Sequence, residues 1–284
     1  MRIRKVQGHR YALSPGGIWV RDFVSTKQTG PDISNITKVE ERGVLLLNRI
    51  LNRAAKPNVQ DMNPKKRPKV LVVSDGLGFK DIGPVLEGLP KDVYVIGVNR
   101  ALSKWGADWR PMNLFLANSP YQDAMRMLWK HRNKPWPPCL VSSRVFPGFL
   151  EAYEGPLFLY EPACEENFAW RVESGCLRLD DYRNPVCAAV CLAERCLVDR
   201  LAFLCCDDSF REERAGSVPA REGHWCYPAQ IVAHGVIDSM LGWMESCGRE
   251  GVRFADSSHG PEYTHANYIP KEALAAFFQG EVDD

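Results

Sequence analysis

The chain has 284 residues, 45% hydrophobic and 25% charged, which is typical of a globular protein and excludes a fibrous or disordered class. Its 36 Lys and Arg nearly balance its 35 Asp and Glu, so the formal net charge of +1 supplies no field for binding DNA or anionic membranes. The N-terminus lacks the apolar stretch of a signal peptide, and no window reaches the roughly 18 apolar residues of a membrane span. We therefore expect a cytoplasmic protein with no transmembrane segment, no evident nucleic-acid surface and reduced cysteines.

Residues 1 to about 35 show no sustained hydrophobic period and predict an irregular arm. From Asn35 to Ala55 the apolar residues fall largely on one helical face, which predicts an amphipathic helix. A polar, proline-punctuated linker follows. We expect residues 1–60 to form an N-terminal arm and residues 61–284 to form the main domain. The arm's helix could dock on the core or pair with a second copy, so a homo-oligomer stays open.

From Lys69 onward, apolar runs of strand length alternate with helical patterns, which predicts a Rossmann-like α/β fold. The strands read as continuous apolar runs, as expected for a mostly parallel sheet with helices on both faces. The predicted strands are Val70–Val73, Val93–Val98, Asn113–Ala117, Cys139–Ser142, Leu157–Tyr160, Leu201–Cys205 and Val252–Ala255. The predicted helices are Asp81–Glu87, Tyr121–Lys130, Val186–Cys196, Ala229–Ser246 and Lys271–Phe278.

The first candidate site is the loop SDGLGF, which follows the first predicted strand. Gly76 and Gly78 permit a sharp turn and let backbone N–H groups approach an anion, and the next helix would add its positive end. Neither GxGxxG nor GxxxxGK[ST] is present. The loop is therefore either a phosphate site or a tight turn, and Asp75 could instead cap the helix.

Polar residues follow the next two predicted strands as well. Asn99 and Arg100 end one strand, and Asn118 and Ser119 end the next. Ligands of open α/β sheets bind beyond the carboxyl ends of the strands, and an asparagine amide can read a base edge or a ribose. Either asparagine alone would more simply be a turn residue, whereas the two together favour a ligand site.

Asp207 and Asp208 emerge at the end of a later strand, where a carboxylate could bind ribose hydroxyls, a metal or a substrate amine, or serve only as an N-cap or in a loop salt bridge. Four of the six histidines follow: His224, His234, His259 and His265. His224 precedes a predicted helix and could act as a general base, whereas His234 lies within that helix and is expected to be partly buried. The histidine spacing matches no zinc motif, so no metal site is predicted, and the absence of GxSxG argues against a serine hydrolase.

In order along the chain, these segments resemble a superfamily of three groups. It comprises the MptE-like 6-hydroxymethylpterin diphosphokinases, the motility-associated-factor proteins and the bacterial lipo-oligosaccharide sialyltransferases of similar fold. The pieces are SDGLGF (74–79), GVNRA (97–101), FLANSP (115–120), NPVCAA (184–189) and CCDDSF (205–210). The resemblance covers residues 69–270. The chain departs from the family pattern at Leu77-Gly78, which replaces Pro-Ser, at Pro185-Val186, which replaces glycines, and at Cys205, which replaces the glycine of G-x-D.

The resemblance implies a nucleotide-binding transferase domain. Asp75, Gly76 and Gly78 would form the phosphate loop, with Asn99, Asn118 and Ser119 beside the nucleotide. Asp207 would be the family's G-x-D aspartate, and His224, in the position of the Gly-His pair, would be the general base.

Three functions follow from the resemblance. The first is an inverting, sialyltransferase-like glycosyltransferase with a nucleotide-sugar donor and a glycan or small-molecule acceptor. For this function the sequence implies no particular cofactor. The second is pyrophosphate transfer from ATP to a small hydroxymethyl acceptor, with Mg²⁺ held partly by Asp207 or Asp208. The third, which the departures from the family pattern favour, is a nucleotide-binding or assembly module without activity.

Overall fold

The computed structural model describes residues 3–6, 9–13, 19–21, 69–120, 124–162, 177–179, 181, 184–207, 209–220, 223–247 and 252–281. Near the N-terminus, β1 (Ile3–Val6), β2 (His9–Leu13) and β3 (Trp19–Arg21) form an antiparallel sheet in that order. The irregular conformation predicted for this segment is therefore wrong where these three strands lie. The amphipathic helix predicted between Asn35 and Ala55 lies outside the described residues, and the domain boundary at residue 60 stays a prediction.

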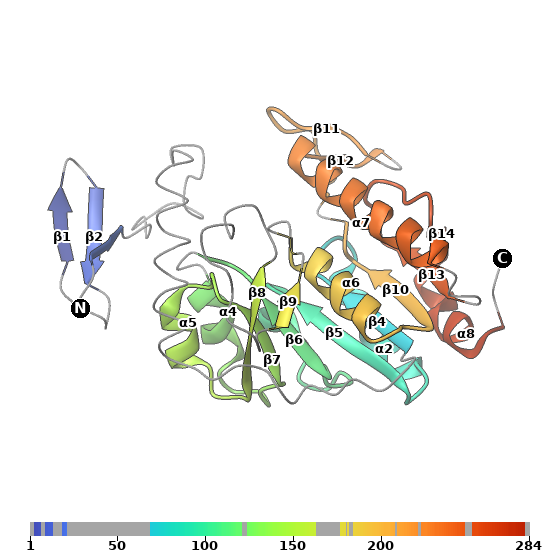
Figure 1. The fold of residues 1–284 in the computed structure, drawn as a ribbon, viewed down its shortest axis with the longest axis horizontal. Helices are drawn as coiled ribbons and strands as arrows, with labels where there is room; N and C mark the ends of the chain where they lie inside the picture. Colours follow the sequence, from blue (N-terminus) through green and yellow to red (C-terminus); the bar gives the residue numbers. More distant parts are fainter. Residues whose placement is uncertain are drawn as a thin grey trace.

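The main body is a parallel α/β sheet of nine strands in the order β14-β13-β10-β4-β5-β6-β7-β8-β9, with every neighbouring pair parallel (Figure 1). This confirms the predicted Rossmann-like fold. Its strands are β4 (Lys69–Val73), β5 (Val93–Val98), β6 (Leu114–Ala117), β7 (Cys139–Ser142), β8 (Leu157–Pro162), β9 (Leu177–Leu179), β10 (Arg200–Leu204), β13 (Arg253–Ser257) and β14 (Asn267–Tyr268). All seven predicted strands are present, and within this nine-stranded sheet the sequence analysis missed the short edge strands β9 and β14.

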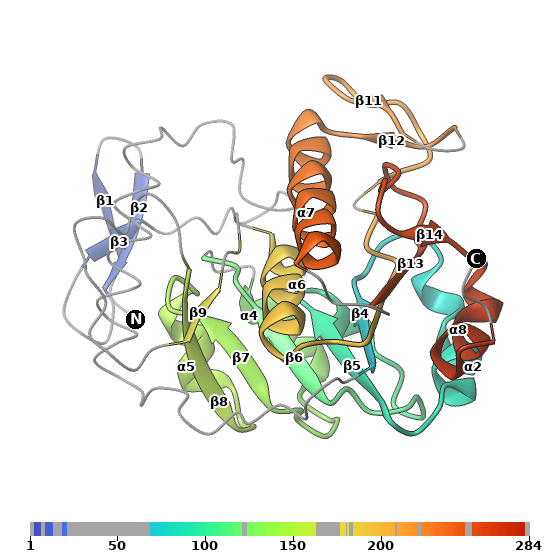
Figure 2. The ribbon, with the colours of Figure 1, turned by 45° about the vertical axis from the view of Figure 1, so that its right-hand side comes forward.

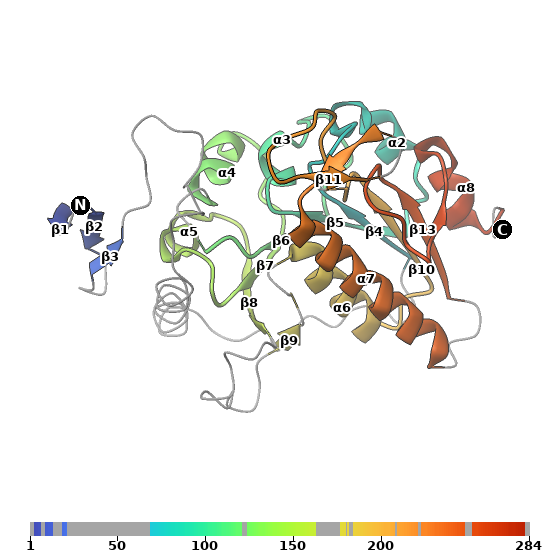
Figure 3. The same ribbon diagram turned by 90° about the horizontal axis from the view of Figure 1, so that it is seen from above.

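Helices cover both faces of this sheet (Figure 3). In β4, Leu71 and Val73 point into the core under one set of helices, while Val70 and Val72 point into the core under the other. Such strands are apolar on both sides, which is why they read as unbroken hydrophobic runs. The first set is α2 (Gly83–Gly88), α3 (Ala101–Lys104), α4 (Ala124–His131), α5 (Pro147–Ala152) and α8 (Leu274–Gln279), and the second is α6 (Pro185–Arg195) and α7 (Pro228–Ser246).

Short 3₁₀ turns and a small hairpin complete the fold around the sheet. The predicted helix Asp81–Glu87 is a 3₁₀ turn, η2 (Phe79–Asp81), followed by the short α2, which begins with Pro84 in its first turn. A second 3₁₀ turn, η5 (Lys271–Ala273), precedes α8. After β10, β11 (Val218–Pro219) and β12 (Trp225–Cys226) form a hairpin near the start of α7 (Figure 2). The hairpin was not predicted, because strands of two residues carry no periodic signal.

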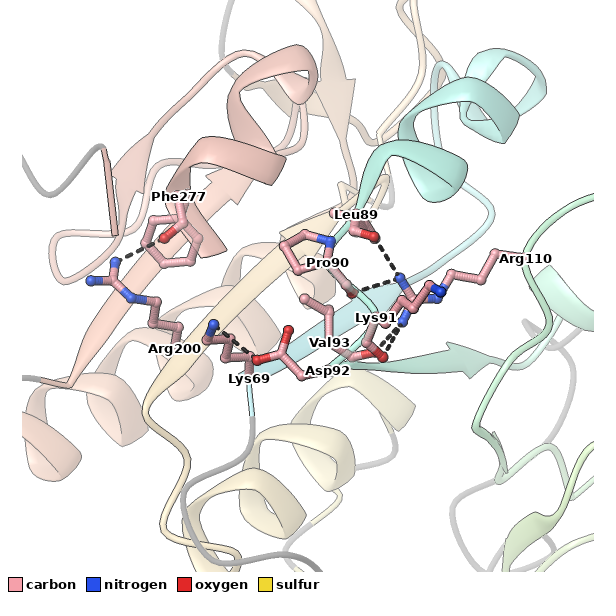
Figure 4. A network of polar contacts seen from close by, with 9 residues as sticks. All are labelled: Lys69, Leu89, Pro90, Lys91, Asp92, Val93, Arg110, Arg200 and Phe277. Carbon is pink, nitrogen blue, oxygen red and sulfur yellow. Dashed lines mark hydrogen bonds and ion pairs between the residues drawn. The ribbon is translucent and has the colours of Figure 1, made fainter. Parts of the chain in front are cut away.

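The amino ends of β4, β5 and β10 carry charged groups whose contacts are structural (Figure 4). The Arg110 guanidinium donates to the carbonyls of Leu89, Pro90, Lys91 and Val93 at 2.7–3.1 Å. These carbonyls belong to the turn between α2 and β5, and a single planar fork pairs all of them. Arg110 therefore fixes the entry into β5.

Replacing Arg110 with methionine is expected to destabilise the domain by about 3 kcal/mol, because four carbonyls lose a charged donor and only some are regained by water. Urea unfolding followed by circular dichroism measures this change. Arg110→Lys is the matched control and should recover only part of the loss, because one ammonium cannot span all four acceptors. A midpoint unchanged in Arg110→Met would contradict the clamp.

A second pair of contacts at this edge has the same character. Lys69 Nζ lies 2.9 Å from Asp92 Oδ2, and Arg200 Nη1 donates to the Phe277 carbonyl at 2.9 Å while its guanidinium covers the Phe277 ring (Figure 4). These contacts join the first residues of the strands to neighbouring segments. Those side chains predicted to bind ligand that the structure describes lie toward the opposite, carboxyl edge.

Candidate functional site

The candidate site lies where the chain reverses its direction through the sheet. From β4 the chain steps to β5 and onward to β9, then returns through α6 to β10 on the other side of β4. The loops after β4 and β10 therefore leave the sheet side by side and diverge. In open α/β sheets, ligands bind in the crevice formed at such a point.

The glycine loop after β4 packs against the end of β10. Gly76 N–H donates to the Cys205 carbonyl at 3.0 Å, and Leu77 N–H donates to the two carboxylate oxygens of Asp207 at 3.2 and 3.1 Å. A Cβ on Gly76 would lie 1.7 Å from Asp207 Oδ1 and 2.6 Å from the Cys205 carbonyl oxygen. Only glycine fits there, and the groups that the loop approaches belong to this protein.

Asp207 holds this loop in place. Its side chain is fully buried, and Ser209 Oγ donates to Oδ2 at 3.0 Å in addition to the Leu77 amide. Burial raises the pKa of the Asp207 carboxyl, and the hydrogen bonds from Leu77 and Ser209 partly oppose that rise. Asp208, the other predicted carboxylate, lies outside the described residues.

Cys205 follows β10 and adopts a backbone conformation that favours glycine. Its φ is 54°, in the left-handed region that glycine adopts at least cost. Burial raises the pKa of the Cys205 thiol to about 12, so this cysteine is not a nucleophile near neutral pH. Cys205 therefore adds a buried, inert side chain at this turn.

The two predicted asparagines meet directly. Asn99 Nδ2 donates to Asn118 Oδ1 at 3.1 Å, and the Asn118 backbone N–H donates to Asn99 Oδ1 at 3.2 Å. Asn99 has a φ of 43°, which asparagine tolerates better than most residues. Ser119 is half-buried beside them, and its carbonyl accepts from Phe146 N–H at 3.1 Å. The pair presents amide groups at the carboxyl ends of β5 and β6, next to the loop after β4.

Asp75 pairs with cations rather than capping a helix. Its Oδ2 lies 2.8 Å from Lys104 Nζ and 3.2 Å from Arg100 Nε, and its side chain is 8% exposed. Lys104 Nζ also donates to the Asp75 carbonyl at 3.0 Å. The loop after β4 is thus tied to the segment after β5 as well as to the end of β10.

His224 lies in the hairpin between β11 and β12, and its ring lies against that of His259, with 5.3 Å between centroids. His259 follows β13, and its electrostatic interaction with Asp207 lowers the pKa of that carboxyl. Ser209 Oγ, which donates to Asp207, also lies 3.5 Å from the His259 carbonyl oxygen. The predicted base and the predicted aspartate are therefore linked through His259, a residue to which the sequence analysis gave no role.

His234 is a buried structural residue, as predicted from its place in a helix. It is 3% exposed, and its ring stacks on Tyr263 at 5.1 Å and hydrogen-bonds to the Asp207 backbone. Burial lowers the pKa of His234 to about 4. Its Nδ1 has no hydrogen-bond partner within the part of the chain that the structure describes.

Stability is expected to fall as the pH drops from about 6.5 to about 4, because the unfolded chain protonates His234 in this window and the folded protein does not. The full effect is about 3 kcal/mol. Chemical unfolding of the wild type and of His234→Gln at pH 7 and pH 4.5 measures it. The variant should lose less stability on acidification, and equal losses in the two proteins would contradict the assignment.

His265 lies apart from this group. Its Nδ1 is 2.9 Å from Glu245 Oε2, and its backbone N–H donates to Asp238 Oδ1 at 2.9 Å. Both partners belong to α7. His265 thus joins the loop before β14 to that helix.

A buried polar cluster at the same edge of the sheet was missed. Arg144 Nη2 lies 2.9 Å from Asp181 Oδ1, which is 2% exposed, and Tyr160 donates to Asp181 Oδ2 at 3.2 Å. Ser143 donates to Glu161 at 2.8 Å. Arg144 and Glu161 lie just beyond one predicted strand and at the end of the next, so the criterion that singled out Asn99 would have found them. Buried ions require such partners, because an uncompensated buried charge is strongly destabilising.

The described residues contain no group of three or more His, Cys, Asp or Glu arranged to hold a metal ion. Among the same residues, no helix combines the length and apolar character needed to cross a bilayer.

Comparison with known proteins finds a similar fold but no related sequence. No family model matches the sequence, and no curated protein matches it. The fold is similar to that of a MAf glycosyltransferase. That structure, from Magnetospirillum magneticum AMB-1, superposes with a TM-score of 0.63 at 15% identity. The match covers 82% of this chain and 39% of the MAf chain. The similarity confirms the fold implied by the sequence resemblance to motility-associated-factor proteins.

Proposed function

We propose that this protein is a glycosyltransferase that moves a sugar from a nucleotide-activated donor to a hydroxyl group of a glycan or small-molecule acceptor. The observation that carries the proposal is the meeting of His224, His259 and Asp207 beside the glycine loop, at the point where the sheet reverses its strand order. The likeness in fold to the MAf glycosyltransferase supports it, because that protein is itself a glycosyltransferase. Membership of the wider MptE-like superfamily belongs to the same proposal.

The donor nucleotide would lie over the carboxyl ends of β4, β5 and β6. The Asn99–Asn118 pair supplies amide donors and acceptors suited to a base or a ribose. Gly78 leaves open space at the turn of the glycine loop, since a Cβ there would have no atom within 4 Å. Ser119, which follows Asn118 at the end of β6, would lie beside the nucleotide.

His224 would take the proton of the acceptor hydroxyl. As the hydroxyl oxygen bonds to the anomeric carbon, the bond between that carbon and the phosphate oxygen breaks, and its electron pair leaves with the nucleotide. Attack opposite the leaving group inverts the configuration. An imidazole suits the base role because it exchanges protons near neutral pH, and His259 beside it would restrain the ring.

Pyrophosphate transfer from ATP is the less supported alternative. It would need a carboxylate to hold Mg²⁺. Both Asp207 oxygens already accept hydrogen bonds and the side chain is fully buried, so metal binding there would break the contact with the loop. Asp207 instead fits the role of a loop anchor.

A thermal-shift panel tests the proposal, with CMP, CTP, UDP-sugars, GDP-sugars and ATP, each with and without Mg²⁺. A nucleotide present at a hundredfold excess over its Kd stabilises the folded state by about 2.7 kcal/mol, which raises Tm by several degrees. We expect a shift with one class of nucleotide or nucleotide sugar. A response to ATP alone, and only with Mg²⁺, would favour the diphosphokinase, and no shift at all would contradict both enzymes.

A further inference from the structure

The backbone of the glycine loop is largely occupied. A loop of this kind binds phosphate through its free N–H groups. Here Gly76 N–H already donates to the Cys205 carbonyl and Leu77 N–H to Asp207. The expected helix end is also absent, since the residues after the loop form the 3₁₀ turn η2 and then the six-residue α2. A phosphate at this loop therefore needs another source of positive charge.

Two cations lie beside the loop. Arg100 Nε and Lys104 Nζ approach the same Asp75 oxygen, at 3.2 and 2.8 Å, so these two nitrogens are at most about 6 Å apart. Their formal charges exceed that of Asp75 by one unit. The side chains remain accessible, with Arg100 70% and Lys104 47% exposed, whereas Asp75 is only 8% exposed. Asp75 thus holds both cations at the surface of the crevice without cancelling their charge.

The geometry of Arg100 favours a phosphate ligand. Its Nε is engaged by Asp75, while its two terminal nitrogens have no partner among the residues that the structure describes. A guanidinium presents these nitrogens as a planar fork that matches two phosphate oxygens, and a nearby ammonium adds a point charge. Lys104 is further held by the Asp75 carbonyl and by the face of the Phe79 ring.

We infer that Arg100 and Lys104, positioned by Asp75, bind the phosphate of the donor in place of the loop amides. The ligand class is a phosphate ester or diphosphate carrying at least one negative charge. The inference deepens the proposed function and rests on it for the identity of the donor.

Calorimetric titration of the purified full chain tests this, with CMP, UDP, their nucleosides cytidine and uridine, and inorganic pyrophosphate as probes. The wild type should bind a phosphorylated probe at least about tenfold more tightly than the nucleoside, and less tightly as salt rises. Arg100→Gln and Lys104→Gln should each weaken binding of phosphorylated probes by at least about tenfold and leave nucleoside binding unchanged. Lys91→Gln, an exposed lysine at the opposite edge of the sheet, is the matched control.

The outcomes separate this inference from the proposed function. If nucleotides bind and neither substitution weakens them, the phosphate assignment is overturned while a nucleotide site remains. If pyrophosphate alone binds and both substitutions abolish it, the phosphate site stands and the nucleotide-sugar donor does not. If no probe binds the wild type at millimolar concentration, both are overturned. Circular dichroism of the variants verifies that these exposed substitutions leave the fold intact.

Discussion

Replacing Gly76 with alanine is expected to destabilise the main domain by about 3 kcal/mol and to abolish nucleotide binding. The added Cβ would lie 1.7 Å from Asp207 Oδ1 and 2.6 Å from the Cys205 carbonyl oxygen. The Asp207 side chain cannot simply turn away, because Leu77 N–H and Ser209 Oγ both hold it in a fully buried position. The loop must therefore move off the end of β10.

Urea unfolding and a repeat of the nucleotide panel measure the two effects. Gly235→Ala in α7 is the matched control, because a Cβ there meets no atom within 4 Å. Alanine at that helical position should leave stability unchanged or raise it by up to about 1 kcal/mol. If Gly76→Ala unfolded at the wild-type midpoint and still bound nucleotide, the packing of the loop against Asp207 would be disproved.

The positions of the strands along the chain could be predicted because burial on both faces makes each strand a continuous apolar run. That pattern places the end of each strand to within a residue or two, and so places Asn99 and Asn118 at one edge. Their hydrogen bond follows from β5 and β6 being neighbours, which holds for most consecutive strands of such folds.

Contacts between distant segments could not be predicted. Leu77 and Asp207 are 130 residues apart, and nothing in either segment encodes their hydrogen bond. The sequence analysis therefore assigned the loop amides to a ligand and Asp207 to ribose or catalysis, although the structure joins them to each other. The partnership of His224 and His259 was missed for the same reason, since both lie in segments without periodicity.

The error over the helix after the glycine loop has a local cause. The apolar spacing around Ile82 and Leu86 predicts one helix from Asp81, but Pro84 is best accommodated in a first turn. The helix therefore starts at Gly83, and the residues before it form a 3₁₀ turn. Because the helix starts later, its positive end does not follow the glycine loop directly. Arg100 and Lys104 are therefore the nearer source of positive charge for a phosphate.

Replacing His224 with glutamine is expected to lower the rate of sugar transfer by a factor of about 10² to 10⁴, which is the usual contribution of a positioned general base. Nucleotide affinity should change by less than about twofold, because His224 lies in the β11–β12 hairpin and the proposed donor contacts lie after β4, β5 and β6. Glutamine retains hydrogen-bonding capacity but cannot accept a proton near neutral pH.

The measurement is single-turnover transfer from the donor that the nucleotide panel identifies, with affinity determined in parallel. His265→Gln is the control, since that histidine pairs with Glu245 on α7 and should retain the wild-type rate. Full transfer activity in His224→Gln would reject His224 as the base. His259 would then be the next candidate, because its ring lies against that of His224 and it interacts electrostatically with Asp207. A rate loss in His224→Gln without a loss in His265→Gln would instead support His224 as the base. His259 would then serve to position that base.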